Sequence, residues 1–242
     1  MKKLYAKSEL LFSIFWIVLY VAGTSLVQGI GEKIGQQDAL VFLLHLALTV
    51  FLLVWLSKNK LTKRFGLCKT DVKASSFLYY IPFLLLVSVN LFAGFDFAKP
   101  TAELVFGFGS MLCVGFLEEI IFRGFLFTAM AKDNLKVAAI VSSVTFGIGH
   151  IINLLNGAEI LPTVCQILYA TAFGFLCVVV FYKGKTLLPC IIAHSAVNAL
   201  SVFTQEPTTL AQTIVPGIVL FVVAACYAIY LWKKLPDRGV AI

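Results

Sequence analysis

Charged side chains are scarce in this sequence. Asp, Glu, Lys and Arg make up only 13% of the 242 residues, whereas hydrophobic residues make up 60%. Soluble domains carry about 25% charged and roughly 45–50% apolar residues, and the mean hydropathy here is +0.97. A soluble globule of this size could not bury so much apolar surface, and disordered chains have the opposite composition. The composition therefore excludes a soluble enzyme and a disordered protein, and it indicates a polytopic membrane protein.

Several familiar catalytic and metal-binding patterns are also missing. The six cysteines include no pair at CxxC spacing, and five of them lie in apolar runs. This pattern predicts small helix-facing residues rather than a disulfide framework or a thiolate metal site. The sequence has no GxSxG, no HExxH and no strong Ser–Lys pair. A covalent serine nucleophile is therefore not indicated, and water is the better candidate for a nucleophile.

The sequence contains long apolar runs. A membrane-spanning helix needs about 20 mostly apolar residues. We therefore expect an all-α protein with about eight transmembrane helices, forming a single membrane-embedded domain over residues 1–242. The predicted spans are 10–28, 38–56, 76–93, 103–130, 137–155, 160–181, 186–203 and 210–232.

The basic residues are distributed unevenly between the two predicted faces. If the N-terminus is cytoplasmic and each span crosses once, sixteen of the 19 Lys and Arg residues fall in cytoplasmic segments. Only Lys33 and Lys99 fall outside, and Arg123 lies within the fourth span. By the positive-inside rule, both termini are predicted to be cytoplasmic. The net charge of +7 then reflects loops that face anionic membrane lipids, and no nucleic-acid partner is expected.

Three charged residues interrupt the fourth span. A charge at the bilayer centre costs about 2.5–3.5 kcal/mol, so such residues point to function. Glu119 and Arg123 are four residues apart, share a helix face and are expected to pair. Glu118 points about 100° away from Glu119, into different surroundings. One carboxylate is therefore expected to be neutralised, leaving Glu118 free for chemistry.

Other polar residues lie at comparable depths in neighbouring spans. At 1.5 Å per residue, Glu118 and His150 lie roughly 20 Å from the predicted inner boundary, His194 about 12 Å and Asn198 about 18 Å. These residues share a layer between the bilayer middle and its inner half. A Glu beside a His can deprotonate a water, and His and Asn side chains can donate to a developing oxyanion. This set of side chains predicts amide hydrolysis by water without a covalent intermediate.

Three short motifs resemble those of the CAAX protease and bacteriocin-processing family, also called CPBP or Abi. The motifs EExxxR, FxxxH and HxxxN/D occur here in order as Glu118–Arg123, Phe146–His150 and His194–Asn198. Each motif is weak alone, but the ordered triplet on separate predicted spans is specific. The resemblance covers about residues 104–200, which we expect to form the catalytic core.

The resemblance implies a glutamate-type intramembrane endopeptidase related to the type II CAAX prenyl endopeptidases. Glu118 and His150 would activate the water, His194 and Asn198 would form the oxyanion hole, and Glu119 and Arg123 would support them. The implied substrate is a peptide or a lipidated protein, and the implied cavity opens towards the cytoplasm and the lipid. The compact chain suggests the cell membrane of a bacterium.

Two alternatives remain open at this point. Glu118, His150 and His194 could instead hold a zinc ion with a site left for water, although the preferred interpretation has no cofactor. The protein could also be no enzyme, but a transporter or a catalytically silent membrane partner such as an immunity factor. Transporters commonly carry internal repeats, and none is visible here, which lowers that option.

Overall fold

The computed structural model describes residues 1–205 and 207–238, and these residues form a helical protein. A single isolated bridge, between Phe95 and Thr204, is the strand-like pairing in the described chain. The helices are α1 Lys2–Lys7, α2 Glu9–Ile34, α3 Gln37–Lys58, η1 Ala74–Tyr80, α4 Ile81–Ser88, η2 Val89–Ala93, α5 Thr101–Glu118, η3 Glu119–Phe127, α6 Thr128–Ala131, α7 Leu135–Gly149, α8 Ile152–Leu155, α9 Ile160–Gly184, α10 Leu188–Ser201 and α11 Leu210–Lys234.

The prediction of an all-α, polytopic membrane protein is confirmed, with seven membrane-length helices in the described residues rather than eight. The predicted span 186–203 folds as α10, which has 14 residues. At 1.5 Å per residue α10 is about 21 Å long, shorter than the roughly 30 Å hydrocarbon core. Pro189 lies in the first turn of α10, a position that favours the start of a helix. Beyond Ser201 the chain turns, and the Thr204 hydroxyl donates to the Ser201 carbonyl at 2.7 Å.

The third predicted span is helical but irregular. Leu78, Tyr79 and Tyr80 have φ angles of 50°, 52° and 59°, in the left-handed region that residues with a Cβ seldom adopt. The Tyr227 hydroxyl donates to the Phe77 carbonyl at 2.7 Å and so satisfies a buried acceptor beside this turn. As a result, the regular α-helix of this span begins only at Ile81.

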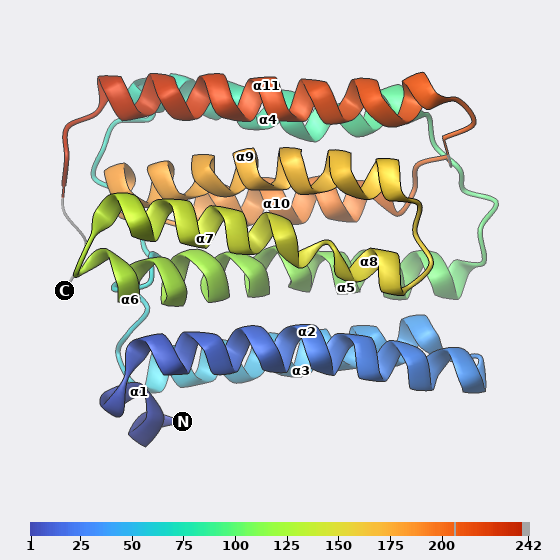
Figure 1. The fold of residues 1–242 in the computed structure, drawn as a ribbon, viewed down its shortest axis with the longest axis horizontal. Helices are drawn as coiled ribbons and strands as arrows, with labels where there is room; N and C mark the ends of the chain where they lie inside the picture. The colour runs from blue at the N-terminus through green and yellow to red at the C-terminus, as the bar shows by residue number, and fades with distance from the viewer. Residues whose placement is uncertain (206, 239–242) are drawn as a thin grey trace.

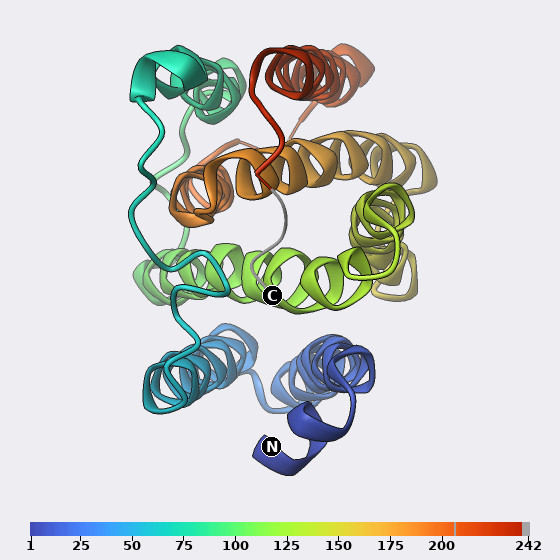
Figure 2. The ribbon, with the colours of Figure 1, turned by 90° about the vertical axis from the view of Figure 1, so that its left-hand side faces the viewer.

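The long helices lie roughly parallel in stacked pairs (Figure 1). From one face to the other, the pairs are α4 with α11, α9 with α10, α5 with α7, and α2 with α3, as the end-on view in Figure 2 also shows. Successive long helices run in opposite directions, so α1 and the last turn of α11 lie at the same end of the bundle. We call this end the basic end; it carries α1 and the connections 59–73, 132–134 and 185–187. The other end, called the distal end, carries the connections 35–36, 94–100, 156–159 and 202–205.

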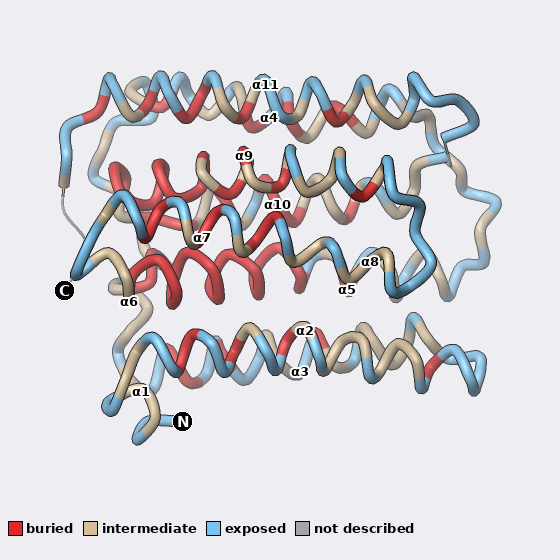
Figure 3. The backbone as a smooth tube through the Cα atoms, viewed as in Figure 1, coloured by how far each residue is buried: buried red, intermediate tan, exposed pale blue. Residues whose placement is uncertain are grey.

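The packed core lies towards the basic end (Figure 3). All nine residues of η3 are buried, and so is the stretch of α9 from Leu176 to Gly184. Aromatic rings fill the space between these helices and α2: Phe12 stacks on Trp55 at 5.0 Å and meets Phe125 edge-on at 5.0 Å. The basic end of the bundle is therefore closed by close-packed side chains.

The chain that follows α11 folds back over the basic end. Lys183, only 2% exposed, donates to the Leu235 carbonyl at 2.7 Å and pairs with Asp237. Arg238 donates to the Asp71 carboxylate, and these hydrogen bonds lower the pKa of Asp71 to about 2. These contacts hold the segment 235–238 against the connection that precedes η1.

Candidate active site

The two adjacent glutamates lie where α5 changes into a π-helix. Glu118 is the last residue of α5, and Glu119 is the first residue of η3. A π-helical stretch has a wider turn than an α-helix, and such stretches occur frequently at functional sites. Glu119 is fully buried, whereas Glu118 is 9% exposed and lines a cavity. The two carboxylates therefore have the different surroundings that their spacing predicted.

Glu119 forms the expected ion pair with Arg123. Arg123 Nη1 lies 3.1 Å from Glu119 Oε1, and both side chains are fully buried. The guanidinium also lies 4.0 Å from the centre of the Phe146 ring, and Nε donates to the Gly174 carbonyl at 3.4 Å. A Cβ on Gly174 would lie 2.6 Å from Arg123 Nη2, so this glycine leaves the room that the guanidinium occupies. Arg123 thus connects η3 to α7 and α9.

His194, on α10, lies between the two carboxylates. Its Nδ1 is 2.9 Å from Glu119 Oε1, and its Nε2 is 3.3 Å from Glu118 Oε2. The rings of Phe146 and Phe173 meet the imidazole edge-on at 5.7 and 5.2 Å and fix its plane. His194 therefore links the supporting ion pair to Glu118.

A glycine on α5 allows α10 to bring His194 this close. A Cβ on Gly115 would lie 2.3 Å from Ser195 Oγ and 2.5 Å from its backbone nitrogen. Ser195 also donates to the Leu112 carbonyl at 2.9 Å, which ties the two helices together. Because Gly115 has no side chain, the backbones of α5 and α10 can touch beside the site.

Tyr20 is a site residue that the sequence patterns did not identify. Its hydroxyl, on α2, donates to Glu118 Oε1 at 2.9 Å. With His194 near Oε2, both oxygens of Glu118 have a protein neighbour. Tyr20 lies outside the three motifs, and the one available signal was that a tyrosine hydroxyl within an apolar run needs a partner.

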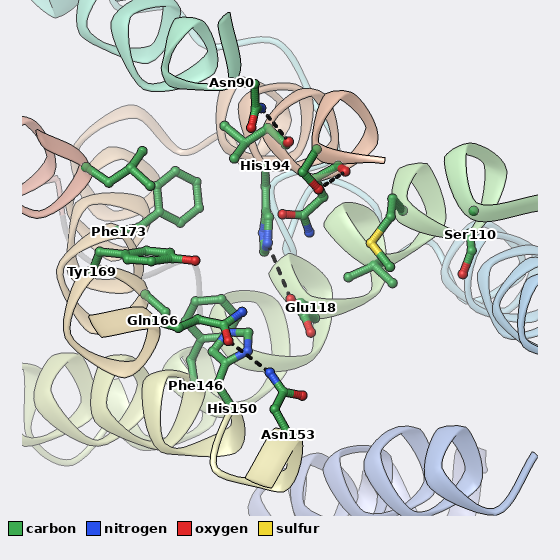
Figure 4. A pocket seen from close by; sticks show the side chains of 18 of the residues that line it. Asn90, Ser110, Glu118, Phe146, His150, Asn153, Gln166, Tyr169, Phe173 and His194 are labelled. Atoms are coloured by element: carbon green, nitrogen blue, oxygen red, sulfur yellow. Dashed lines mark hydrogen bonds and ion pairs between the residues drawn. The ribbon is translucent and has the colours of Figure 1, made fainter. Parts of the chain in front are cut away.

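His150 and Asn198 line the same cavity as Glu118 and His194. Figure 4 shows His150, Glu118 and His194 around this cavity. His150 immediately follows the last turn of α7, and its ring meets Phe146 edge-on at 5.5 Å. Among the described residues, neither the His150 imidazole nor the Asn198 amide has a hydrogen-bond partner. The structure therefore brings Glu118 into contact with His194 rather than with His150, and it leaves His150 and Asn198 facing the cavity.

The cavity has a volume of about 580 Å³ and is walled by most of the long helices. A smaller hollow of about 150 Å³ shares Tyr20, Glu118 and His150 with it. Beside His150, Asn153 donates to Gln166 at 2.9 Å and lines the cavity with polar atoms. The space is large enough for an extended peptide segment and for the water that hydrolysis needs.

The residues of the zinc alternative do not fit a metal ion as they are placed. Among the described residues, the candidate metal-ligand group whose ligand atoms all lie within 4.8 Å of one another is Glu119, Cys177 and Cys190, all buried. Glu118, His150 and His194 do not form such a group. Nδ1 of His194 is also directed at Glu119, leaving only Nε2 towards the cavity. The proposed reaction therefore uses these side chains without a metal ion.

The membrane-length helices surround a cavity that Glu, His and Asn side chains line, and these are polar groups that a hydrolase uses. Residues 100–200 match the family described as type II CAAX prenyl endopeptidase, Rce1-like. This segment, which runs from α5 into α10, is thus similar to a peptidase family, as the resemblance of the motifs predicted. No curated protein and no solved structure matched the chain significantly.

Proposed function

We propose that this protein is an intramembrane endopeptidase that hydrolyses a peptide bond in a membrane-associated peptide or protein, using water activated by Glu118 and His150. The position of Glu118 is the observation that supports this proposal. Its buried carboxylate reaches the cavity beside His194, and His150 and Asn198 line the same cavity. A carboxylate in a largely apolar cavity is well suited to accept a proton from water.

In the proposed reaction, a water held between Glu118 and His150 gives a proton to Glu118 while its oxygen attacks the scissile carbonyl carbon. The carbonyl oxygen becomes an oxyanion, and His194 and Asn198 donate hydrogen bonds to it. When the C–N bond breaks, protonated Glu118 returns its proton to the leaving amine. Tyr20, which donates to Glu118 Oε1, orients this carboxylate.

The contacts of His194 determine which of its ring nitrogens carries a hydrogen. Glu119 is paired with Arg123 and, as an ionised carboxylate, can only accept hydrogen bonds, so Nδ1 of His194 is the donor. Donation from Nε2 to the oxyanion then requires a second proton on the ring, because a neutral imidazole with its hydrogen on Nδ1 has none on Nε2. Glu119 and Arg123 are thus proposed as supporting residues that hold His194 in position and do not touch the substrate.

The substrate is proposed to be a peptide or a lipidated protein, and the site of action the cell membrane of a bacterium. The family name implies prenylated CAAX tails as one class of candidates. Processed leader peptides and signalling peptides are other candidates.

The proposal is tested by comparing peptide and protein termini in membranes of cells that make equal amounts of wild type, Glu118→Gln or Glu159→Gln. Gln keeps the size of Glu and removes the base. Glu159 is the matched control because it is an exposed residue at the start of α9, outside the cavity. Mass spectrometry is expected to find new termini with wild type and Glu159→Gln only. Identical termini in all three strains contradict the proposal and favour a catalytically silent partner.

A further inference from the structure

Two polar stripes lead from Glu118 to the distal end of the bundle. On α2, Tyr20, Thr24 and Gln28 follow one another at four-residue spacing and line the cavity. On α10, His194, Asn198 and Ser201 follow one another at spacings of four and three residues and also line the cavity. Residues at these spacings share one helix face. A continuous polar path therefore runs along the cavity wall from the proposed base to the distal end.

The lining of the cavity reaches exposed residues at this distal end, Asp38 and Ser201, and we call this part of the cavity its mouth. Its lining includes Gln37 and Asp38, next to the connection between α2 and α3, and Thr213 in the first turn of α11. No described residue of the basic-end connections lines it. In the other direction from Glu118, the path is blocked by buried apolar side chains of η3, among them Ile121 and Phe125.

The basic residues distinguish the two ends sharply. The distal end carries Lys33 and Lys99, and Lys99 donates to the carbonyls of Val202 and Thr204 at 3.1 and 3.4 Å. Apart from the buried Arg123, the other sixteen Lys and Arg residues lie at the basic end. Under the positive-inside rule the basic end faces the cytoplasm, so the distal end faces away from it.

We propose that the cavity is entered from the non-cytoplasmic side of the membrane. Its substrate, if the proposed peptidase function holds, is then a peptide segment that is exposed on that side, such as an exported peptide or the outer part of a membrane-anchored protein. This proposal differs from the cytoplasmic access that the family resemblance implies.

The direction of access is tested by thiol labelling, which needs no enzyme activity. Ser201→Cys places a reporter at the mouth, and Lys136→Cys places one in the first turn of α7, exposed at the basic end. Cells making either variant are treated with a membrane-impermeant maleimide, intact or permeabilised. Peptide mass spectrometry reads each position separately from the six native cysteines. Asp38→Cys, exposed at the mouth, serves as a second reporter in case the variant at 201 does not fold.

The expected result is labelling at position 201 or 38 in intact cells and at position 136 only after permeabilisation. Labelling at the mouth positions only after permeabilisation overturns the proposal, and so does labelling of both ends in intact cells. A failure of the proposed peptidase function is seen separately, as unchanged termini in the Glu118→Gln comparison, while the labelling pattern stands by itself.

Discussion

Arg123 is the side chain on which the arrangement of the other charged groups depends. It lies 3.1 Å from Glu119, stacks over Phe146 at 4.0 Å and donates to the Gly174 carbonyl, all without exposure to solvent. Burying a charge is costly unless it is paired, so the loss of either partner leaves an uncompensated charge in the core. The pair is therefore expected to show strong energetic coupling.

For this reason we predict that Arg123→Met destabilises the protein by about 3–5 kcal/mol, because the buried carboxylate of Glu119 loses the guanidinium that neutralises it. The double variant Glu119→Gln/Arg123→Met is expected to lose less than the sum of the two single variants, since it removes both charges. Unfolding measured in detergent for the four proteins of this cycle checks the prediction. Strict additivity would show that the two side chains are not coupled.

The proposed reaction uses water without a metal ion, and this leads to a second prediction. The ligand atoms of Glu118, His150 and His194 do not all lie within 4.8 Å of one another, and Nδ1 of His194 is directed at Glu119. Treatment of the purified protein with a zinc chelator is expected to leave the cleavage rate unchanged. Loss of activity with chelator, restored by added zinc, would require these residues to rearrange around a metal.

Much of the site could be predicted from individual residues, because charges within an apolar run are costly and therefore conspicuous. The contact between Glu119 and Arg123 followed from their spacing and is present in the structure. Tyr20 could not be predicted, since its partner lies on a helix distant in sequence and tyrosine is common in membrane spans. The closer approach of His194 than of His150 to Glu118 depends on helix packing, which spacing along the chain does not report.

Among the helices, the contact between α5 and α10 decides whether His194 reaches the carboxylates. Gly115 faces the backbone of Ser195 so closely that a Cβ would lie 2.5 Å from its nitrogen and 2.6 Å from its Cα. A side chain at position 115 would displace Ser195 and, with it, the adjacent His194. The close spacing of α5 and α10 therefore requires a glycine at this position.

Gly115→Ala is accordingly predicted to push α10 away, to cost roughly 1–3 kcal/mol of stability and to reduce cleavage strongly. Gly124→Ala, nine residues further along the same helical segment, is the matched control, because the nearest atom to its Cβ would be 3.6 Å away. Cleavage rates and unfolding of both variants check the prediction. Equal effects of the two substitutions would contradict the role of the close contact.

Helix positions were predictable because hydropathy reports long apolar runs directly. Seven predicted spans match membrane-length helices, whereas the run 186–203 gives the shorter α10. The π-helix η3 and the left-handed Leu78 have no signal in the pattern of apolar residues, since both depend on how the surrounding helices pack. The irregular parts of the fold were therefore the ones that the sequence left undetermined.

The molecule as a whole is asymmetric along the bundle. Buried residues are concentrated at the basic end (Figure 3), where the segment 235–238 is docked. Polar residues, in contrast, line a cavity that extends towards the distal end. Charge counting along the sequence predicted how the two ends differ, but it could not predict where the cavity opens. Under the proposal above, water and substrate therefore reach Glu118 from the distal end.

The central claim is that Glu118 acts as the general base. The most direct test uses the purified protein in liposomes and a synthetic peptide that spans a cleavage site identified in cells. Glu118→Gln is predicted to lower the cleavage rate by about 10²–10⁴-fold, while Glu159→Gln, an exposed carboxylate outside the cavity, leaves it unchanged. A Glu118→Gln protein that is folded and cleaves the peptide at the wild-type rate would contradict the account.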